Sequence, residues 1–375
     1  MTAVRSRRVL ELCSEALFAL GDKTMDNINY TTPDEQLKKL KSQNLIIDHE
    51  GAAIDALSAF GYSNLIKSYR DPYTITVDGK KVYRSGITFK QIYSLYRLDK
   101  NLRNAVIAAM LDLEEHIKEQ ASNVIAESFG THEDSYLNYK NYRNKRKRKE
   151  QFKLSSIIAT MKKTLNTDKD PIHHYKTEHG IVPPWILFKS IYFSTIINFI
   201  DQFKVDERNQ MVHRLYTLSS LGINEEQGRM LMMDTLYLAS DYRNLAAHGG
   251  RVYNHVSDNV VRFDEIFKGQ GQPLSKGFNQ FISSLQLLDY KGPFHHLQKV
   301  LTDEVNRHCS EFPQDVTYLG QTLNMDIIQQ RIVYVTDSGD KYHNDPHCSG
   351  MKDSYALEYE EAQSKGYVPC KRCNK

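Results

Sequence analysis

The chain has 375 residues, 40% hydrophobic and 25% charged, which is long enough for two or three globular domains. Its net charge of +3 gives no bulk attraction to nucleic acid, so any phosphate-binding surface must come from local clusters. Five cysteines are too few for a secreted disulfide framework, Glu11 and Glu15 interrupt the N-terminal apolar stretch, and the most apolar internal segment is short and contains Lys189. We therefore expect a cytoplasmic protein without a membrane span.

The N-terminal third of the chain predicts helices and one small hairpin. Apolar side chains recur at helical spacing in residues 3–20 and 50–59. A further helix is expected to begin after Thr32, because threonine caps helices and a proline and two acids follow it. Asp78-Gly79 predicts a hairpin turn within residues 76–85. Residues 88–128 predict one long helix, whose charged residues, including Asp99 and Arg103, we interpret as a solvated face with local ion pairs.

The most basic segment follows at residues 139–153, with the sequence YKNYRNKRKRKEQFK. One interpretation is an exposed charged connector. The other is a surface that contacts RNA phosphates, with Tyr139, Tyr142 and Phe152 available to stack on unpaired bases. We favour RNA binding, which would position the nucleic acid without selecting a sequence. The consecutive basic residues are Lys145, Arg146, Lys147, Arg148 and Lys149.

Further helices are expected at residues 154–165, 185–203, 207–218 and 226–247. The apolar helix at 185–203 follows Pro183 and Pro184, and we assign it to the core and a dimer interface. His173, His174 and His179 cluster before it without a nearby cysteine, and we interpret them as surface residues rather than metal ligands.

The helix at 226–247 ends in a polar motif. Gly249 and Gly250 predict its end, because glycine readily adopts the left-handed conformation. Arg243, Asn244 and His248 then lie in its last turns. Arginine stays charged and fits phosphate oxygens, and histidine exchanges protons near neutral pH. This combination suits cleavage of an RNA phosphodiester by its own 2′-hydroxyl, without a metal ion.

Two alternatives remain at this motif. A histidine at a helix C-terminus often only caps the last carbonyl groups. An in-line displacement also needs a base and an acid, and two copies of the pair facing each other would supply both. The chemistry therefore indicates a homodimer with a composite site.

The C-terminal part predicts two more helices and a separate small module. Residues 259–267 are expected to be irregular, 278–288 and 293–309 helical, and His295, His296 and His308 ordinary surface residues. From residue 331 the pattern predicts a hairpin turning at residues 337–340, a loop and a short helix at 358–365.

Cysteine and histidine spacing in this tail is typical of a zinc site. Cys370 and Cys373 form a C-x-x-C pair, and we expect Cys348 and His343 to complete a tetrahedral set, with His347 as the competitor for the fourth position. A filled site of this kind has no open position, so we expect a structural zinc. Unmetallated cysteines and a redox dithiol are the alternatives. The segment resembles small zinc-binding modules of bacterial nucleases and DNA-repair proteins.

The segment YRNLAAHGGRVYN at 242–254 resembles the signature of HEPN ribonucleases, and specifically the Abi family of bacterial abortive-infection proteins of the AbiD/AbiF type. YRLDKNLRNAVIAAMLDLEEHI at 96–117 and the proline pair before Trp185 are similar to the same family. The resemblance implies a mostly α fold: a HEPN-like helical bundle at 1–325 with a small β-hairpin insertion. A zinc-binding α/β module at 331–375 would follow it.

By the same resemblance, the protein would be a metal-independent endoribonuclease toxin of phage defence, acting as a homodimer and silenced by a protein or RNA antitoxin. Arg243 would bind the scissile phosphate, His248 would act as base or acid, and Asn244 would support them. Arg251 joins the basic run as an expected RNA contact, and no cofactor is expected at the active site. A non-catalytic RNA-binding protein and a zinc-dependent DNA-binding regulator are the alternatives.

Overall fold

The computed structural model describes residues 29–143, 154–269, 276–327, 332–348 and 351–373. The chain is mostly helical, as expected, and divides into two compact units, residues 1–90 and 91–375. The expected helix at 3–20 lies outside the described residues, and the expected boundary between 325 and 331 stays a prediction. Within the described ranges, no helix is both long and apolar enough to cross a bilayer.

In the described residues of the first unit, two α-helices, a π-helix and a 3₁₀-helix precede the expected hairpin. Helix α2 begins after Thr32, whose side chain and that of Glu35 form a capping box. In the hairpin, Asp78 and Gly79 both have positive φ, at 49° and 75°. A two-residue turn needs positive φ at both positions for its twist to match that of the two strands. The elements are α2 (Pro33–Ser42), α3 (Glu50–Phe60), the π-helix η1 (Ser63–Lys67), the 3₁₀-helix η2 (Asp71–Tyr73), β1 (Thr74–Val77) and β2 (Lys80–Tyr83).

A single long helix, α4 (Phe89–Phe129), follows close to the predicted bounds, and from Gln91 on it belongs to the second unit. The helical part of this unit continues through α5 (Glu133–Tyr136), η3 (Tyr139–Asn141), α6 (Leu154–Thr164), α7 (Ile172–His179), α8 (Pro184–Leu187), η4 (Phe188–Ser190), α9 (Phe193–Ile200), α10 (Val205–Leu215), α11 (Leu218–Leu221), α12 (Glu225–Ala247), α13 (Phe263–Ile266), α14 (Phe278–Gln286), α15 (Gly292–Glu311), η5 (Pro313–Asp315) and α16 (Val316–Leu323). The short helix α13 lies in a segment that we expected to be irregular.

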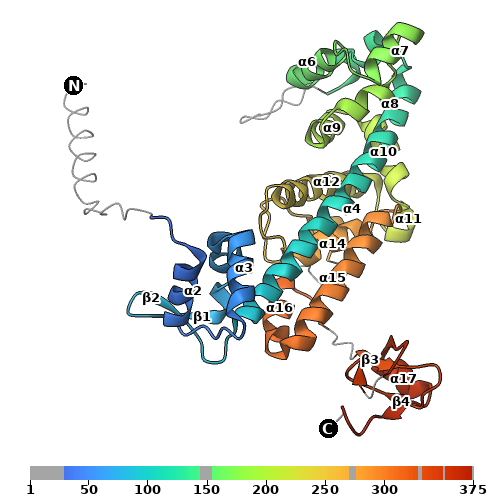
Figure 1. The fold of residues 1–375 in the computed structure, drawn as a ribbon. Coiled ribbons are helices and arrows are strands. Elements are labelled where there is room, and N and C mark those ends of the chain that lie inside the picture. The colour runs from blue at the N-terminus through green and yellow to red at the C-terminus, as the bar shows by residue number, and fades with distance from the viewer. Residues whose placement is uncertain (1–28, 144–153, 270–275, 328–331, 349–350, 374–375) are drawn as a thin grey trace, which may run out of the picture. The chain divides into compact units, whose positions relative to one another are not determined.

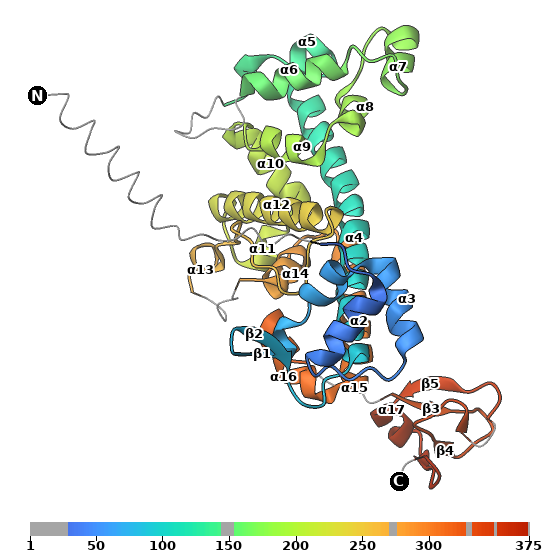
Figure 2. The same ribbon diagram turned by 60° about the vertical axis from the view of Figure 1, so that its left-hand side comes forward.

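Helix α12 packs against α9, α10 and α14 (Figure 1) and against α13, while α6 packs against α9 (Figure 2). Asn224 caps the N-terminus of α12 in a capping box with Gln227. Leu231, Leu238 and Tyr242 are buried, as their helical spacing predicts, while Leu245 is half-buried. The helix that carries the polar motif is therefore held along its length by four others.

The expected single helix at 185–203 is wrong. The chain forms α8, the 3₁₀-helix η4 and α9, and Ile191 between them has an extended backbone with φ −101° and ψ 138°. Apolar residues are almost continuous here, so a straight helix would present them on every side. The break instead lets both pieces bury their apolar side chains, among them Leu187, Phe188, Ile196 and Phe199.

His308 is not a surface residue, contrary to expectation. It is wholly buried between Ser94 of α4 and Asp315 of η5. Its Nδ1 lies 2.9 Å from the Ser94 Oγ, and its Nε2 lies 2.9 Å from an Asp315 carboxylate oxygen. Gln91 donates to both oxygens of that carboxylate. Burial explains the network, since a polar side chain in the core is stable only when its hydrogen bonds are made.

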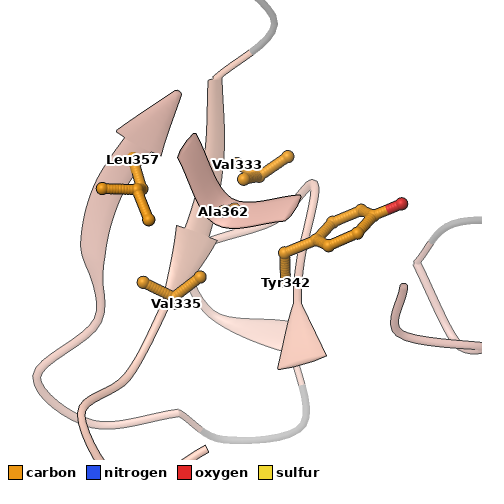
Figure 3. Close-up of a cluster of buried hydrophobic side chains, with 5 residues drawn as sticks. All are labelled: Val333, Val335, Tyr342, Leu357 and Ala362. Atoms are coloured by element: carbon orange, nitrogen blue, oxygen red, sulfur yellow. The ribbon is translucent and has the colours of Figure 1, made fainter. Parts of the chain in front are cut away.

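The C-terminal tail has its own small core (Figure 3). Val333, Val335, Tyr342, Leu357 and Ala362 form a buried cluster. Strand β3 (Ile332–Val335) pairs antiparallel with β5 (Tyr355–Glu358), and β4 (Lys341–Tyr342) pairs in parallel with β6 (Val368–Pro369).

Only one antiparallel bridge of the predicted tail hairpin forms. In it, Tyr334 and His343 exchange backbone hydrogen bonds of 2.7 and 2.8 Å. We expected a loop where β5 forms, and the predicted short helix is α17 (Tyr359–Ser364).

Candidate functional site

Helix α12 ends in a Schellman motif, which fixes the backbone around His248. The Gly250 N–H donates to the Leu245 carbonyl at 2.9 Å, and the Gly249 N–H donates to the Ala246 carbonyl at 3.1 Å. Gly249 has φ +74°, a conformation that costs other residues energy. A Cβ on Gly250 would lie 2.2 Å from Leu245 Cδ1. The left-handed conformation favours glycine at position 249, a side chain at position 250 would displace that of Leu245, and His248 becomes the C-cap residue of the helix.

The predicted catalytic side chains all reach solvent at this end. Asn244 and His248 are exposed, and Arg243 is half-buried. Asn244 and His248 are four residues apart, so they share one face of the helix. Arg243 lies roughly 140° from His248 around the axis, by helix geometry. Its Nη1 nevertheless donates to the Asn244 Oδ1 at 3.3 Å, which directs the guanidinium toward the face that carries His248.

The His248 imidazole is available for chemistry. Its backbone N–H caps the helix by donating to the Asn244 carbonyl at 3.0 Å. Within the part of the chain that the structure describes, no hydrogen bond or ion pair engages its ring. The interpretation of His248 as a side chain that caps the last carbonyl groups is therefore not supported, since the two glycine N–H groups satisfy carbonyls there.

Asp99 of α4 holds the segment that leaves the motif, and sequence reasoning missed it. Its Oδ1 accepts the backbone N–H groups of Val252 and Tyr253 at 2.9 and 3.0 Å. Arg103 donates to the Gly249 carbonyl at 2.7 Å and lies 3.8 Å from the other Asp99 oxygen. Asp99 is wholly buried, so its expected place on a solvated face is wrong. A signal existed: Asp99 occupies a buried position of the apolar repeat formed by Leu95, Leu102 and their neighbours.

A second imidazole is fixed beside the motif. His255 Nε2 lies 2.9 Å from an Asp241 carboxylate oxygen, and the Tyr242 hydroxyl donates to the His255 carbonyl at 3.0 Å. The Tyr242 ring stacks on Phe281, with centroids 4.3 Å apart. Burial, followed by the charge of Asp241, raises the pKa of Tyr242, so this hydroxyl stays protonated and keeps its hydrogen bond. The chain on both sides of the motif is thus anchored to the core.

The expected RNA-binding residues are only partly described. Lys145, Arg146, Lys147, Arg148 and Lys149 lie outside the described residues, as does Phe152. Arg251 follows the two glycines and is half-buried. Tyr139 is exposed, but Tyr142 is buried and its hydroxyl donates to the Tyr136 carbonyl, so the expectation that Tyr142 stacks on bases is wrong.

Comparison with protein families matches residues 55–254 to the Abi-like protein family, and this range includes the end of α12 with Arg243, Asn244 and His248. The chain belongs to the Abi-like family. No curated protein and no solved structure matches it. Membership suggests a part in abortive infection, the response to phage for which the family is named.

The tail of this Abi-like protein contains a group that could hold a metal ion. The nearest ligand atoms of four residues all lie within 4.8 Å of one another: His343, Cys348, Cys370 and Cys373. These are the residues expected from the sequence. Cys348 and Cys370 Sγ are 4.0 Å apart, and Cys373 Sγ is 3.6 Å from His343 Nδ1.

The donor set fits zinc. Tetrahedral geometry with zinc–sulfur bonds of about 2.3 Å places two thiolates roughly 3.8 Å apart, near the observed separation. The backbone N–H of Arg372 donates to the Cys370 Sγ at 3.5 Å and is the main cause that lowers the pKa of this thiol. Burial raises the pKa of Cys373. His343 is buried at the group, whereas His347 is exposed and is not a member of it, which favours His343 as the fourth ligand.

Proposed function

We propose that this Abi-like protein is a metal-independent endoribonuclease toxin of HEPN type, acting in abortive infection through Arg243, Asn244 and His248. The observation that carries the proposal is the end of α12, where an accessible imidazole and a guanidinium directed toward the same face lie on an anchored backbone. Preorganised groups of this kind stabilise a charged transition state without rearranging during the reaction.

The reaction follows from the chemistry of the two groups. His248 takes the proton of a 2′-hydroxyl, whose oxygen attacks the adjacent phosphorus while the bond to the 5′-oxygen breaks. Arg243 binds the non-bridging oxygens and stabilises the charge that develops on them. The departing 5′-oxygen receives a proton from an acid, and the products are a 2′,3′-cyclic phosphate and a 5′-hydroxyl. Asn244 holds the Arg243 guanidinium in place.

A homodimer would supply the acid as the His248 of a second copy. The basic run and Arg251 would bind the RNA backbone, and an antitoxin, either a protein or an RNA, would restrain the activity in uninfected cells. The tail would bind zinc through His343, Cys348, Cys370 and Cys373 as a structural ion.

Growth and RNA cleavage together test the proposal. Wild type, His248→Ala and the control His296→Ala, which changes an exposed histidine of α15, would be expressed and cellular RNA ends mapped. We expect growth arrest and 2′,3′-cyclic phosphate ends from wild type and His296→Ala. His248→Ala should cleave at least about a hundredfold more slowly, since general acid–base catalysis contributes that much.

Two further variants separate the alternatives. A non-catalytic RNA-binding protein would arrest growth equally well with His248→Ala and would leave transcripts intact. A zinc-dependent DNA-binding regulator would lose its effect with Cys373→Ser and tolerate Arg243→Ala. Either pattern would contradict the nuclease proposal.

A further inference from the structure

Two arginines from separate segments of the second unit converge on Asp201, far along the chain from the motif, and a third, Arg229, contacts Asn209 beside one of them. Arg143 follows η3, Arg208 lies in α10 and Arg229 lies in the first half of α12. Arg143 Nη2 donates to the Asp201 backbone carbonyl at 2.7 Å, and the same nitrogen lies 3.8 Å from the Asp201 carboxylate. Arg208 Nη1 lies 3.9 Å from the same carboxylate oxygen. Arg229 Nη1 donates to the Asn209 Oδ1 at 2.5 Å.

The positive charge of this cluster is only partly compensated, because two guanidinium groups share the carboxylate of Asp201. Both distances to the Asp201 carboxylate are too long for hydrogen bonds. The Nε atoms of Arg143 and Arg208 are buried without a hydrogen-bond partner in the described part of the chain. Burial and the charges of Arg143 and Arg229 lower the pKa of Arg208, against the opposing effect of Asp201.

Two further acids directly precede Arg208 in the sequence, the exposed Asp206 and then Glu207. Glu207 is buried, and its charge helps to raise the pKa of Tyr142. Its Oε2 also has no hydrogen-bond partner among the described residues.

The cluster is open to a ligand. The Arg143 and Arg208 side chains keep 30% and 14% of their surface exposed, and Arg229 is also half-buried. Partly desolvated guanidinium groups with unused donors bind anions strongly, and their planar forks match phosphate oxygens. From Arg143, the sequence continues directly into the basic residues 145–149.

We infer that Arg143, Arg208 and Arg229 form a binding site for a backbone phosphate of single-stranded RNA. The inference rests on the proposed ribonuclease function and adds a second point of contact. Arg229 and Arg243 are on the same helix, and their offset of 14 positions corresponds to about 21 Å along its axis. The cluster would therefore hold the strand several nucleotides from the bond that is cut, positioning it without selecting a base.

RNA binding by a variant that cannot cleave RNA tests this site. In a His248→Ala background, a fluorescein-labelled single-stranded RNA would be titrated by fluorescence anisotropy at several salt concentrations. Arg229→Gln should weaken binding about tenfold, because one charge-assisted contact is lost. It should also reduce the slope of log K against log salt by about 0.7. The matched control is Lys299→Gln, which removes the same charge from a side chain that is 75% exposed.

A second variant and a competitor complete the test. Arg208→Gln should reproduce the result, and circular dichroism would verify that each variant is folded. Arg229→Gln keeps the backbone hydrogen bond of Arg143, so it tests the site even if Arg208→Gln does not fold. Equal affinity of Arg229→Gln and Lys299→Gln for the RNA would overturn the inference. Inorganic phosphate should compete with the RNA less effectively in Arg229→Gln than in Lys299→Gln, and equal competition in the two variants would overturn it as well. If the wild-type protein did not cleave RNA at all, that result would instead contradict the proposed function.

Discussion

The Asp99 carboxylate accepts hydrogen bonds from two backbone N–H groups, of Val252 and Tyr253, and so fixes the segment that leaves the motif. Arg103 extends this link to the Gly249 carbonyl, next to His248. A buried carboxylate is stable only when its charge is balanced, and two backbone donors on one oxygen and the Arg103 guanidinium 3.8 Å from the other supply that balance. We interpret Asp99 as a positioning residue for the proposed active site.

Replacing Asp99 with alanine should lower both stability and activity. Two buried N–H groups would lose their acceptor, at a cost of about 2–4 kcal/mol in the free energy of unfolding. Urea unfolding measures this cost, and the control Glu115→Ala, on an exposed position of α4, should change it by less than about 0.5 kcal/mol. The rate of RNA cleavage should fall more than RNA affinity, because the motif backbone would be less well held. An equal effect of Asp99→Ala and Glu115→Ala would contradict the positioning role.

The sequence identifies residues that act locally and misses those that act across the chain. The placement of Arg243, Asn244 and His248 together at one helix end could be predicted because they lie within two helical turns and precede a glycine pair. Asp99 is separated from Val252 by 153 positions, and Ser94 from His308 by 214, so no local pattern links them. Charged residues are usually exposed, which made the wrong interpretation of Asp99 and His308 the natural one.

Helix α12 shows how an element places chemistry at its end. Its capping box begins it, packing against four helices holds it, and the Schellman motif stops it at His248. Each of these features except the packing partners can be read from local sequence, because capping and glycine termination depend on neighbouring residues. The break between α8 and α9 could not be, because both pieces are apolar and only tertiary packing decides where the helix bends.

Replacing Gly249 with alanine should disturb this helix end. Its φ of +74° costs an L-residue about 1 kcal/mol, so the free energy of unfolding should fall by about that amount. RNA cleavage should fall as well, because His248 immediately precedes the strained residue. The control is Gly51→Ala in α3, where no atom lies within 4 Å of the added Cβ and φ is not positive. That change should leave activity intact and raise stability by about 0.5 kcal/mol. Unchanged stability and activity in Gly249→Ala would show that the motif does not depend on this turn.

Across the whole molecule, the chain carries two candidate sites that differ in their need for a metal ion. The motif at 243–248 offers a base and a cation, and the proposed reaction needs no metal ion. The tail offers three thiols and an imidazole, together with a small apolar core. A module of this size gains much of its stability from a bound metal. Metal removal should therefore affect the tail while RNA cleavage by the motif continues.

Chelation combined with thiol alkylation examines this separation directly. In zinc-loaded protein at pH 8, iodoacetamide should label Cys348, Cys370 and Cys373 slowly, and a chelator should make all three reactive. Cys309 serves as the internal control, because burial, followed by the charge of Asp315, raises its pKa to about 11. Only about one in a thousand of its thiols is then ionised at pH 8, since the pH lies three units below that pKa. Peptide mass spectrometry measures each residue separately.

The paired variants His343→Ala and His347→Ala identify the fourth ligand in the same experiment. His343→Ala should lower zinc affinity at least about tenfold, whereas His347→Ala, at an exposed residue outside the group, should not. The chelated wild type should still produce 2′,3′-cyclic phosphate ends at close to the original rate. If chelation abolished cleavage while circular dichroism showed intact helices, the metal would take part in the reaction, and a proton-transfer mechanism confined to Arg243 and His248 would be wrong.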